Sequence, residues 1–192
     1  MLSKDRRNLQ NSPSRSGRCH NEGLRYLLPH SHEARGSSCN RETSFFGYLT
    51  SQPSLQVILL ARQQAARVLW ELQGTAFEPY VSKLVIDEAA RGDPTQARLR
   101  LTECQHIPQI EITPQAVDLS QRLMDTHAVP LTEPEDALHI ALATLAEMDY
   151  IVSLNFSHMV GAQAKFALQT QIQNLGFKPP LLVTPDDLLE IL

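Results

Sequence analysis

From residue 43 onward, hydrophobic and polar positions repeat at the spacings typical of helices and strands. Short apolar runs at 77–81, 107–112, 150–154 and 181–183 predict β-strands. The longest helical pattern covers residues 55–73 and begins behind Ser54, a residue type that caps helices. Its predicted buried stripe consists of Val57, Ile58, Ala61, Ala65, Val68, Leu69 and Leu72, with Arg62, Gln63 and Arg67 outside it.

Capping residues mark the starts and ends of the other helices. The predicted starts are Ser82, Asp93 before Pro94, Thr113 before Pro114, a capping box over 132–135, and Thr184 before Pro185. The predicted stops are Gly92 and Gly176. The helices expected between these signals cover residues 83–91, 94–104, 114–126, 136–147 and 159–175, with a last one after Pro185. Helices and strands therefore alternate along most of the chain.

This alternation predicts a three-layer α/β/α fold, in which a mostly parallel central sheet lies between two layers of helices. The chain has 192 residues, of which 42% are hydrophobic, and this is enough for one ordinary core. We expect the domain to cover residues 41–192. In such folds ligands bind beyond the carboxyl ends of the strands, so side chains at those ends are the first candidates for chemistry.

Residues 1–40 differ in composition from the rest of the chain. They are rich in Ser, Asn, Arg, Gly and His, follow no helical or strand period, and are predicted to be a largely disordered extension. Residues 1–41 hold 8 Lys and Arg against 3 Asp and Glu, whereas residues 42–192 hold 9 against 18. The acidic part argues against binding nucleic acid through a broad basic face, but it suits a site that gathers carboxylates around a hard cation.

The cysteines and the hydropathy pattern indicate a soluble cytoplasmic protein. No stretch reaches the roughly 18 consecutive apolar residues of a membrane-spanning helix, and the beginning of the chain has no apolar signal-peptide region. The three cysteines show no paired spacing, so we expect reduced thiols. Together with nearby histidines they match no common zinc finger; the residues concerned are Cys19, His20, His30, His32 and Cys39.

Three acids fall where the fold predicts a site. Glu42 precedes an apolar aromatic segment, Glu88 lies in the helix after strand 77–81, and Asp136 opens the helix before strand 150–154. Glu88 and Asp136 are each four residues from an apolar residue on the same helix face, so both border the packed side. A carboxylate beside the packed side loses hydration, which costs free energy unless the group is paired or binds a metal. Taken singly, Glu88 also fits an ordinary surface acid beside the more exposed Asp87, and Asp136 also fits an acid that complements the helix dipole.

Taken together, three segments resemble the PIN domain, the fold of the VapC-like toxin ribonucleases. They are YVSKLVIDEAARGD at 80–93, EDALHIALA at 135–143 and DYIVSLNFSH at 149–158. The segment Glu42-Thr-Ser resembles the end of the first strand in the subgroup that has Glu-Thr-Ser where other members have Asp-x-Ser. The resemblance covers about residues 42–192.

The resemblance implies both the activity and the site. It makes Glu42, Glu88 and Asp136 the metal-binding acids and Ser44 the small polar residue that orients them, and it places Asn155 where many members have a fourth acid. The implied cofactor is Mg²⁺ or Mn²⁺, which prefers carboxylate oxygens and activates water for phosphodiester hydrolysis. The implied function is a metal-dependent endoribonuclease that acts on RNA as the toxin of a toxin–antitoxin pair.

Two histidines lie near these acids. We expect His139 to be a helix residue in the packed layer and His158 to cap the helix that follows, with a catalytic or ligand role as the alternative for each. The basic residues nearby are Lys83, Arg91, Arg98 and Arg100, which fit either RNA attraction or a solvated helix face. The Gln-rich helices at 55–73 and 165–173 are candidate faces for a homodimer or an antitoxin protein.

The first strand departs from the family pattern. PIN domains run an apolar β-branched strand into the first acid, whereas here residues 36–41 read GSSCNR. Either residues 37–42 pair as a short strand in spite of their polar side chains, or an altered gene start has replaced the native strand and damaged the sheet. A non-catalytic RNA-binding or regulatory module is therefore the alternative function. A metabolic α/β enzyme is a more distant one, because no G-x-G-x-x-G, P-loop or G-x-S-x-G motif occurs.

Overall fold

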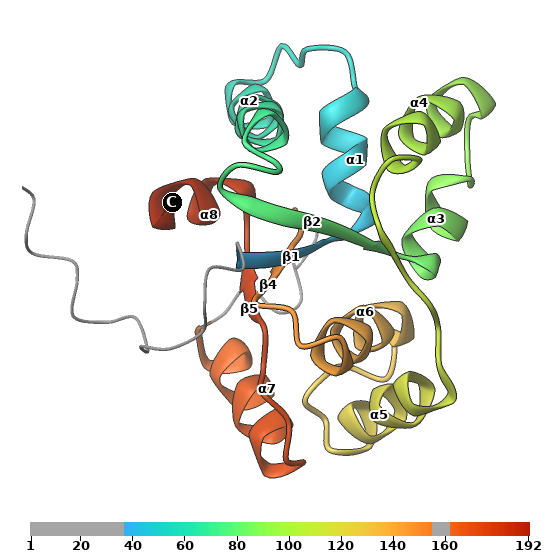
Figure 1. The fold of residues 1–192 in the computed structure, drawn as a ribbon, viewed down its shortest axis with the longest axis vertical. Helices are drawn as coiled ribbons and strands as arrows, with labels where there is room; N and C mark the ends of the chain where they lie inside the picture. Colours follow the sequence, from blue (N-terminus) through green and yellow to red (C-terminus); the bar gives the residue numbers. More distant parts are fainter. Residues whose placement is uncertain (1–36, 155–161) are drawn as a thin grey trace, which may run out of the picture. The chain divides into compact units, whose positions relative to one another are not determined.

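The computed structural model describes residues 37–154 and 162–192 (Figure 1). Within these residues, five strands form one sheet in the order β3-β2-β1-β4-β5, and all of the pairings are parallel. The strands are β1 (Ser37–Arg41), β2 (Phe77–Ser82), β3 (Gln109–Ile110), β4 (Tyr150–Val152) and β5 (Leu181–Val183). No helix of the described segments is both long enough and apolar enough to cross a bilayer.

Helices cover both faces of the sheet, which confirms the three-layer α/β/α prediction (Figure 1). One layer contains α1 (Thr43–Thr50), α2 (Val57–Glu71), α3 (Lys83–Ala89), α4 (Pro94–Cys104) and α8 (Pro185–Ile191). The opposite layer contains α5 (Pro114–Asp125), α6 (Pro134–Leu145) and α7 (Ala162–Asn174). Successive residues of β4 point to opposite faces, so Ile151 joins the core beneath α5–α7 while Tyr150 and Val152 join the core beneath α1 and α2.

Most of the predicted caps are confirmed. The Ser82 hydroxyl group accepts a hydrogen bond from the Val85 amide, and the Asp93 carboxylate accepts hydrogen bonds from the amides of Thr95 and Gln96. Thr184 and Asp187 form a reciprocal capping box. These interactions are local in sequence, which is why the bounds of α4 and β5 coincide with the predicted ones.

Two predicted helix starts are wrong. The capping box at 132–135 does not form: Pro134 occupies the first helical turn, so Glu133 becomes the N-cap residue, and its side chain makes no capping bond. Ser54 does not cap α2, which begins at Val57 after Gln56. The Ser54 hydroxyl group instead accepts a hydrogen bond from the Gln56 amide at 3.1 Å.

Helix α1 was not predicted, because its eight residues include Gly47 and poor helix formers. The burial of Phe45 and Phe46 is what stabilises it.

The predicted buried stripe of α2 is correct only in part. Ala65 and Leu69 are buried, but Val57 and Ile58 are 82% and 71% exposed. Gln63, which we expected outside, is buried. Its amide group donates to the Gln52 carbonyl and its carbonyl oxygen accepts the Ser54 amide, so it pairs backbone groups of the preceding loop that a hydrophobic side chain would leave unpaired.

Strand β1 forms in spite of its polar sequence. It lies at the centre of the sheet and pairs with β2 over residues 37–40 and with β4 over residues 39–41. Of the two alternatives raised by the sequence, the structure therefore has the short strand. The cost is visible in the side chains: Asn40 and Arg41 are both fully buried, and neither amide atom of Asn40 has a hydrogen-bond partner among the described residues.

Arg41 is accommodated by aromatic rings. Its guanidinium carbon lies 4.7 Å from the ring centre of Phe45, 4.9 Å from Trp70 and 5.2 Å from Phe77. Its Nη1 donates to Gln73 Oε1 at 3.1 Å. Arg41 is fully buried, and this burial disfavours the charged form and lowers the pKa of Arg41 to about 10.

Asp149 ties the start of β1 to β4. Its carboxylate accepts the Ser38 amide at 3.0 Å, the Ser38 hydroxyl group at 3.2 Å and Lys178 Nζ at 2.8 Å. Burial acts to raise the pKa of Asp149, but the bonds from Lys178 and Ser38 outweigh it and hold the pKa below its ordinary value. These bonds therefore stabilise the fold fully at pH values above the ordinary pKa of an aspartate. This stabilisation is lost as the pH falls through the lower pKa that Asp149 has in the folded protein.

We predict that Asp149→Asn lowers the free energy of unfolding at pH 7 by about 1 kcal/mol, since Lys178 is exposed and its charge is screened. The difference from wild type should shrink as the pH falls below about 4, where the wild-type carboxylate also becomes protonated. Urea unfolding at pH 7 and pH 3 measures both. Asp118→Asn, at a carboxylate 74% exposed and 3.9 Å from its arginine partner, is the control and should change little at either pH. An equal loss at both pH values would contradict this account of Asp149.

Candidate metal centre

The carboxyl end of β1 places Glu42 at the middle of the sheet edge. Glu42 directly follows the strand, its amide continues the ladder to the Val152 carbonyl at 3.1 Å, and the residue is only 8% exposed. Two hydroxyl groups donate to the same oxygen of its carboxylate, Oε2: Ser44 at 2.5 Å and Ser153 at 2.6 Å. The Leu154 amide in turn donates to Ser44 Oγ at 2.8 Å. The carboxylate is therefore held in one orientation by residues that follow β1 and β4.

Glu88 and His139 face each other across the gap between α3 and α6. His139 Nε2 lies 3.2 Å from both Glu88 oxygens, and the Thr43 hydroxyl group donates to Glu88 Oε2. His139 is 1% exposed, and the Glu88 side chain is 11% exposed. Three elements, α1, α3 and α6, thus meet at this carboxylate.

The two groups shift each other's protonation. Burial acts to raise the pKa of Glu88, but the hydrogen bond and charge of His139, with smaller contributions from Thr43 and Arg91, lower it overall. Burial acts to lower the pKa of His139, but the hydrogen bond and charge of Glu88, together with Glu42 and Asp136, raise it overall. Both shifts favour an imidazolium–carboxylate pair.

Glu42, Glu88 and His139 form a group that fits a divalent cation. One ligand atom from each residue lies within 4.8 Å of the other two. Within the described residues both hydrogen bonds to Glu42 fall on Oε2, so Oε1 is available as a ligand. Carboxylate oxygens are the ligands that Mg²⁺ and Mn²⁺ prefer, and the imidazole nitrogen that His139 would offer after releasing its proton is better tolerated by Mn²⁺. The donor atoms present therefore fit either ion.

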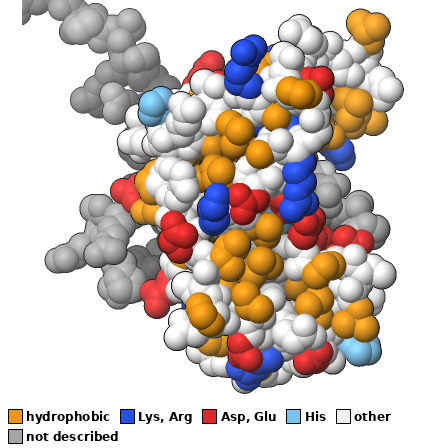
Figure 2. All heavy atoms as spheres, turned by 90° about the vertical axis from the view of Figure 1, so that its right-hand side faces the viewer, with side chains coloured by type: hydrophobic (Ala, Val, Ile, Leu, Met, Phe, Trp, Pro, Cys, Tyr) orange, Lys and Arg blue, Asp and Glu red, His pale blue; other side chains and the backbone are white. Residues whose placement is uncertain are grey.

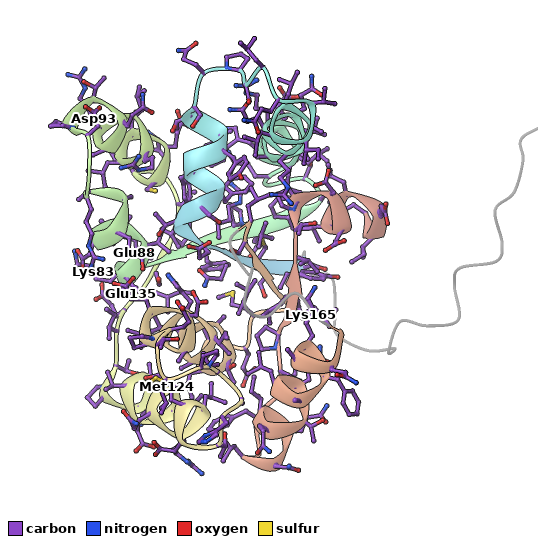
Figure 3. The ribbon with its side chains drawn as sticks, turned by 180° about the vertical axis from the view of Figure 1, so that it is seen from behind. Lys83, Glu88, Asp93, Met124, Glu135 and Lys165 are labelled. Atoms are coloured by element: carbon purple, nitrogen blue, oxygen red, sulfur yellow. The ribbon has the colours of Figure 1, made fainter. Side chains whose placement is uncertain are left out.

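These residues line one cavity of about 420 Å³. Five acids contribute to it: Glu42, Glu88, Glu133, Glu135 and Asp136. Arg91 and Arg100 line it as well. Seen from behind, Glu88 of α3 and Glu135 of α6 lie where the two helix layers approach each other (Figure 3). On the outer face of this region, acidic and basic side chains form a band between two areas of apolar side chains (Figure 2).

The fold is similar to that of solved VapC structures. VapBC2 of Rickettsia felis, described as bound to a DNA fragment from its promoter, aligns with a TM-score of 0.50 and 11% sequence identity, over 77% of this chain and 98% of that one. The chain has the fold of a VapC-like PIN domain. VapC20 of Mycobacterium tuberculosis, described as a toxin that cleaves the sarcin–ricin loop, aligns at a TM-score of 0.48 with 15% identity, over 65% of this chain and 97% of that one. No protein-family model and no curated protein sequence matches the chain.

Within this VapC-like fold, four of the predicted site residues come together. Glu42, Ser44, Glu88 and Asp136 all line the same cavity, although they belong to separate elements. Asn155 and His158 lie outside the described residues, and so do Cys19 and the histidines of the extension. Asp87 is the exposed neighbour that we expected beside Glu88: its carboxylate is 51% exposed and pairs with Lys83 at 2.8 Å.

Two residues of the centre, Thr43 and Ser153, were not predicted to contact it, and a ligand role for His139 was only the alternative to a place in the packed layer. His139 is buried in the helix layer as expected, and it also bonds to Glu88. Its position in sequence offers a signal, because it lies three residues after Asp136 and so on the same side of α6. Ser153 had a signal as well, since it directly follows β4, the strand next to β1. Thr43 offers none, because its contact depends on how α3 packs against α1.

Proposed function

We propose that this chain is a metal-dependent endoribonuclease that hydrolyses RNA phosphodiester bonds with Mg²⁺ or Mn²⁺. The observation that carries the proposal is the group Glu42, Glu88 and His139, whose ligand atoms lie within 4.8 Å of one another at the carboxyl edge of a VapC-like sheet. Asp136 lines the same cavity and supplies a further carboxylate.

Each residue has a role that its contacts support. Glu42 and Glu88 bind the ion through carboxylates that Ser44, Ser153 and Thr43 orient. Asp136, in the first turn of α6, adds negative charge to the cavity. A bound ion would lower the pKa of a coordinated water and offset charge on the scissile phosphate, so no side-chain nucleophile is required. Asn155 and His158 are proposed to position water or phosphate.

We further propose that the enzyme is a cytoplasmic toxin with an antitoxin protein as its partner. The similar Rickettsia structure is of VapBC2, a toxin together with its antitoxin, bound to a promoter DNA fragment. In this chain, large apolar side chains are exposed at the start of α2, where Leu55, Val57 and Ile58 are 103%, 82% and 71% exposed. Phe166 on α7 is 71% exposed. These two faces are the candidates for binding an antitoxin or a second copy of the chain.

The test is cleavage of a mixed structured RNA by the purified full chain with Mn²⁺, Mg²⁺ or EDTA. We expect cutting with either ion, none with EDTA, and a loss of about 100-fold or more in Asp136→Asn and Glu42→Gln. A folded wild-type protein that binds RNA but cuts nothing with either ion would contradict the nuclease and favour the non-catalytic module. Metal-dependent cutting that survives in Glu42→Gln would remove Glu42 from the site.

A further inference from the structure

An exposed ion pair lies at the mouth of the acidic cavity. Arg91 Nη1 is 2.8 Å from Glu135 Oε1, and the two side chains are 62% and 55% exposed. Both residues line the cavity that contains Glu42 and Glu88. The pair joins the turn after α3 to the first turn of α6, so an exposed ion pair lies in the same cavity as the candidate metal ligands.

The backbone of Arg91 is held, whereas its guanidinium group has a partner that can be exchanged. The Arg91 amide donates to the Glu88 carbonyl at 3.0 Å, which ties the turn to a proposed metal ligand. Arg100 donates to the Arg91 carbonyl at 2.7 Å and to the Ala89 carbonyl at 3.2 Å. The Arg100 guanidinium group is thus used to hold the turn, whereas that of Arg91 contacts an exposed carboxylate.

An ion pair this exposed contributes little stability in water. A guanidinium group binds a phosphate through two parallel charge-assisted hydrogen bonds, which are stronger and more directional than a single contact to a mobile carboxylate. When an RNA strand enters the cavity, its backbone brings phosphates next to the one held at the metal ligands. Arg91 is the cavity arginine that is able to change partners to meet one of them.

We propose that Arg91 binds an RNA backbone phosphate adjacent to the cleaved one, and that Glu135 competes with this phosphate for the guanidinium group. The inference rests on the proposed nuclease function and names a substrate-positioning pair for it. Glu135 opposes binding in two ways, since it occupies Arg91 and repels the phosphate. In an acidic cavity, this competition restricts tight binding to strands that place a phosphate at Arg91.

The experiment measures KM, kcat and their salt dependence for cleavage of a labelled single-stranded RNA of mixed sequence by the full chain with Mn²⁺. Arg91→Ala should raise KM about tenfold while kcat changes less than about twofold, because one charge-assisted contact to substrate is lost. The slope of log KM against log salt concentration should fall by about 0.7, the value for one phosphate contact to a single strand. Glu135→Gln should lower KM several-fold, and most of this gain should disappear in the Arg91→Ala background.

Arg62→Ala on α2 and Glu190→Gln on α8 are the matched controls, since both residues are exposed and neither lines the cavity. They should change KM less than about twofold, as expected for distant surface charges under salt screening. If Arg91→Ala behaves like Arg62→Ala, or leaves the salt slope unchanged, the inference is overturned while the nuclease stands. If wild type shows no metal-dependent cleavage, the proposed function itself fails.

Discussion

Glu88→Gln is expected to lower kcat/KM for RNA cleavage by about 100-fold or more and to weaken Mn²⁺ binding to a similar degree, because it removes a charged ligand from the centre of the site. Glu88 is the carboxylate on which α1, α3 and α6 converge, through Thr43, its own helix and His139. Glutamine has the size of glutamate but carries no charge, so the losses of activity and Mn²⁺ affinity measure the missing metal ligand rather than a change in packing. RNA cleavage assays and Mn²⁺ titration calorimetry on the same preparation measure both losses.

Asp87→Asn is the matched control for this prediction. Asp87 is the adjacent acid on α3, but its carboxylate is 51% exposed and pairs with Lys83 at 2.8 Å, outside the cavity. It carries the same charge on the same helix, so its substitution changes the general electrostatics equally. We expect cleavage and Mn²⁺ affinity within about twofold of wild type, as is usual for an exposed charge. Equal losses in both variants would show that α3 contributes only general negative charge.

Asn40→Val is expected to raise the free energy of unfolding by about 1–3 kcal/mol. Asn40 lies in the central strand, is fully buried, and has no partner for its amide nitrogen or amide oxygen among residues 37–154 and 162–192. It points to the face opposite Cys39 and Arg41, and its neighbours in register are Tyr80 of β2 and Ile151 of β4. Valine has a similar volume, removes the unpaired polar atoms and fits a β-strand better.

Urea unfolding of wild type and Asn40→Val, with the slope on denaturant compared, measures this gain. Asn174→Val at the exposed C-terminal residue of α7 is the control, and we expect it to be neutral or slightly destabilising, since a β-branched residue is a poor helix former. A loss of stability in Asn40→Val would show that the Asn40 amide is paired in solution and that the polar strand is well accommodated.

Much of the fold was predictable because its signals are local. The caps at Ser82, Asp93 and Thr184 are satisfied by amides two or three residues away, so the sequence near each cap contains what the helix start requires. The failures follow from competition between local signals, as when Pro134 moved the N-cap of α6 from Thr132 to Glu133 and left the capping box unformed. Helix α1 has no strong local signal, because its stability depends on burying Phe45 and Phe46.

The sequence by itself determined the order of helices and strands from residue 55 onward, the parallel α/β architecture and the set of acids at the strand ends. Only the tertiary structure decided which side chains meet them. Glu88 and His139 are 51 residues apart along the chain, and Ser153 is 111 residues from the Glu42 carboxylate that it orients. Contacts over such separations depend on how helices pack on the sheet, and periodicity and capping carry no information about that packing. The same reason explains Arg41, whose place among three aromatic rings lets a charged residue lie at the centre of the sheet.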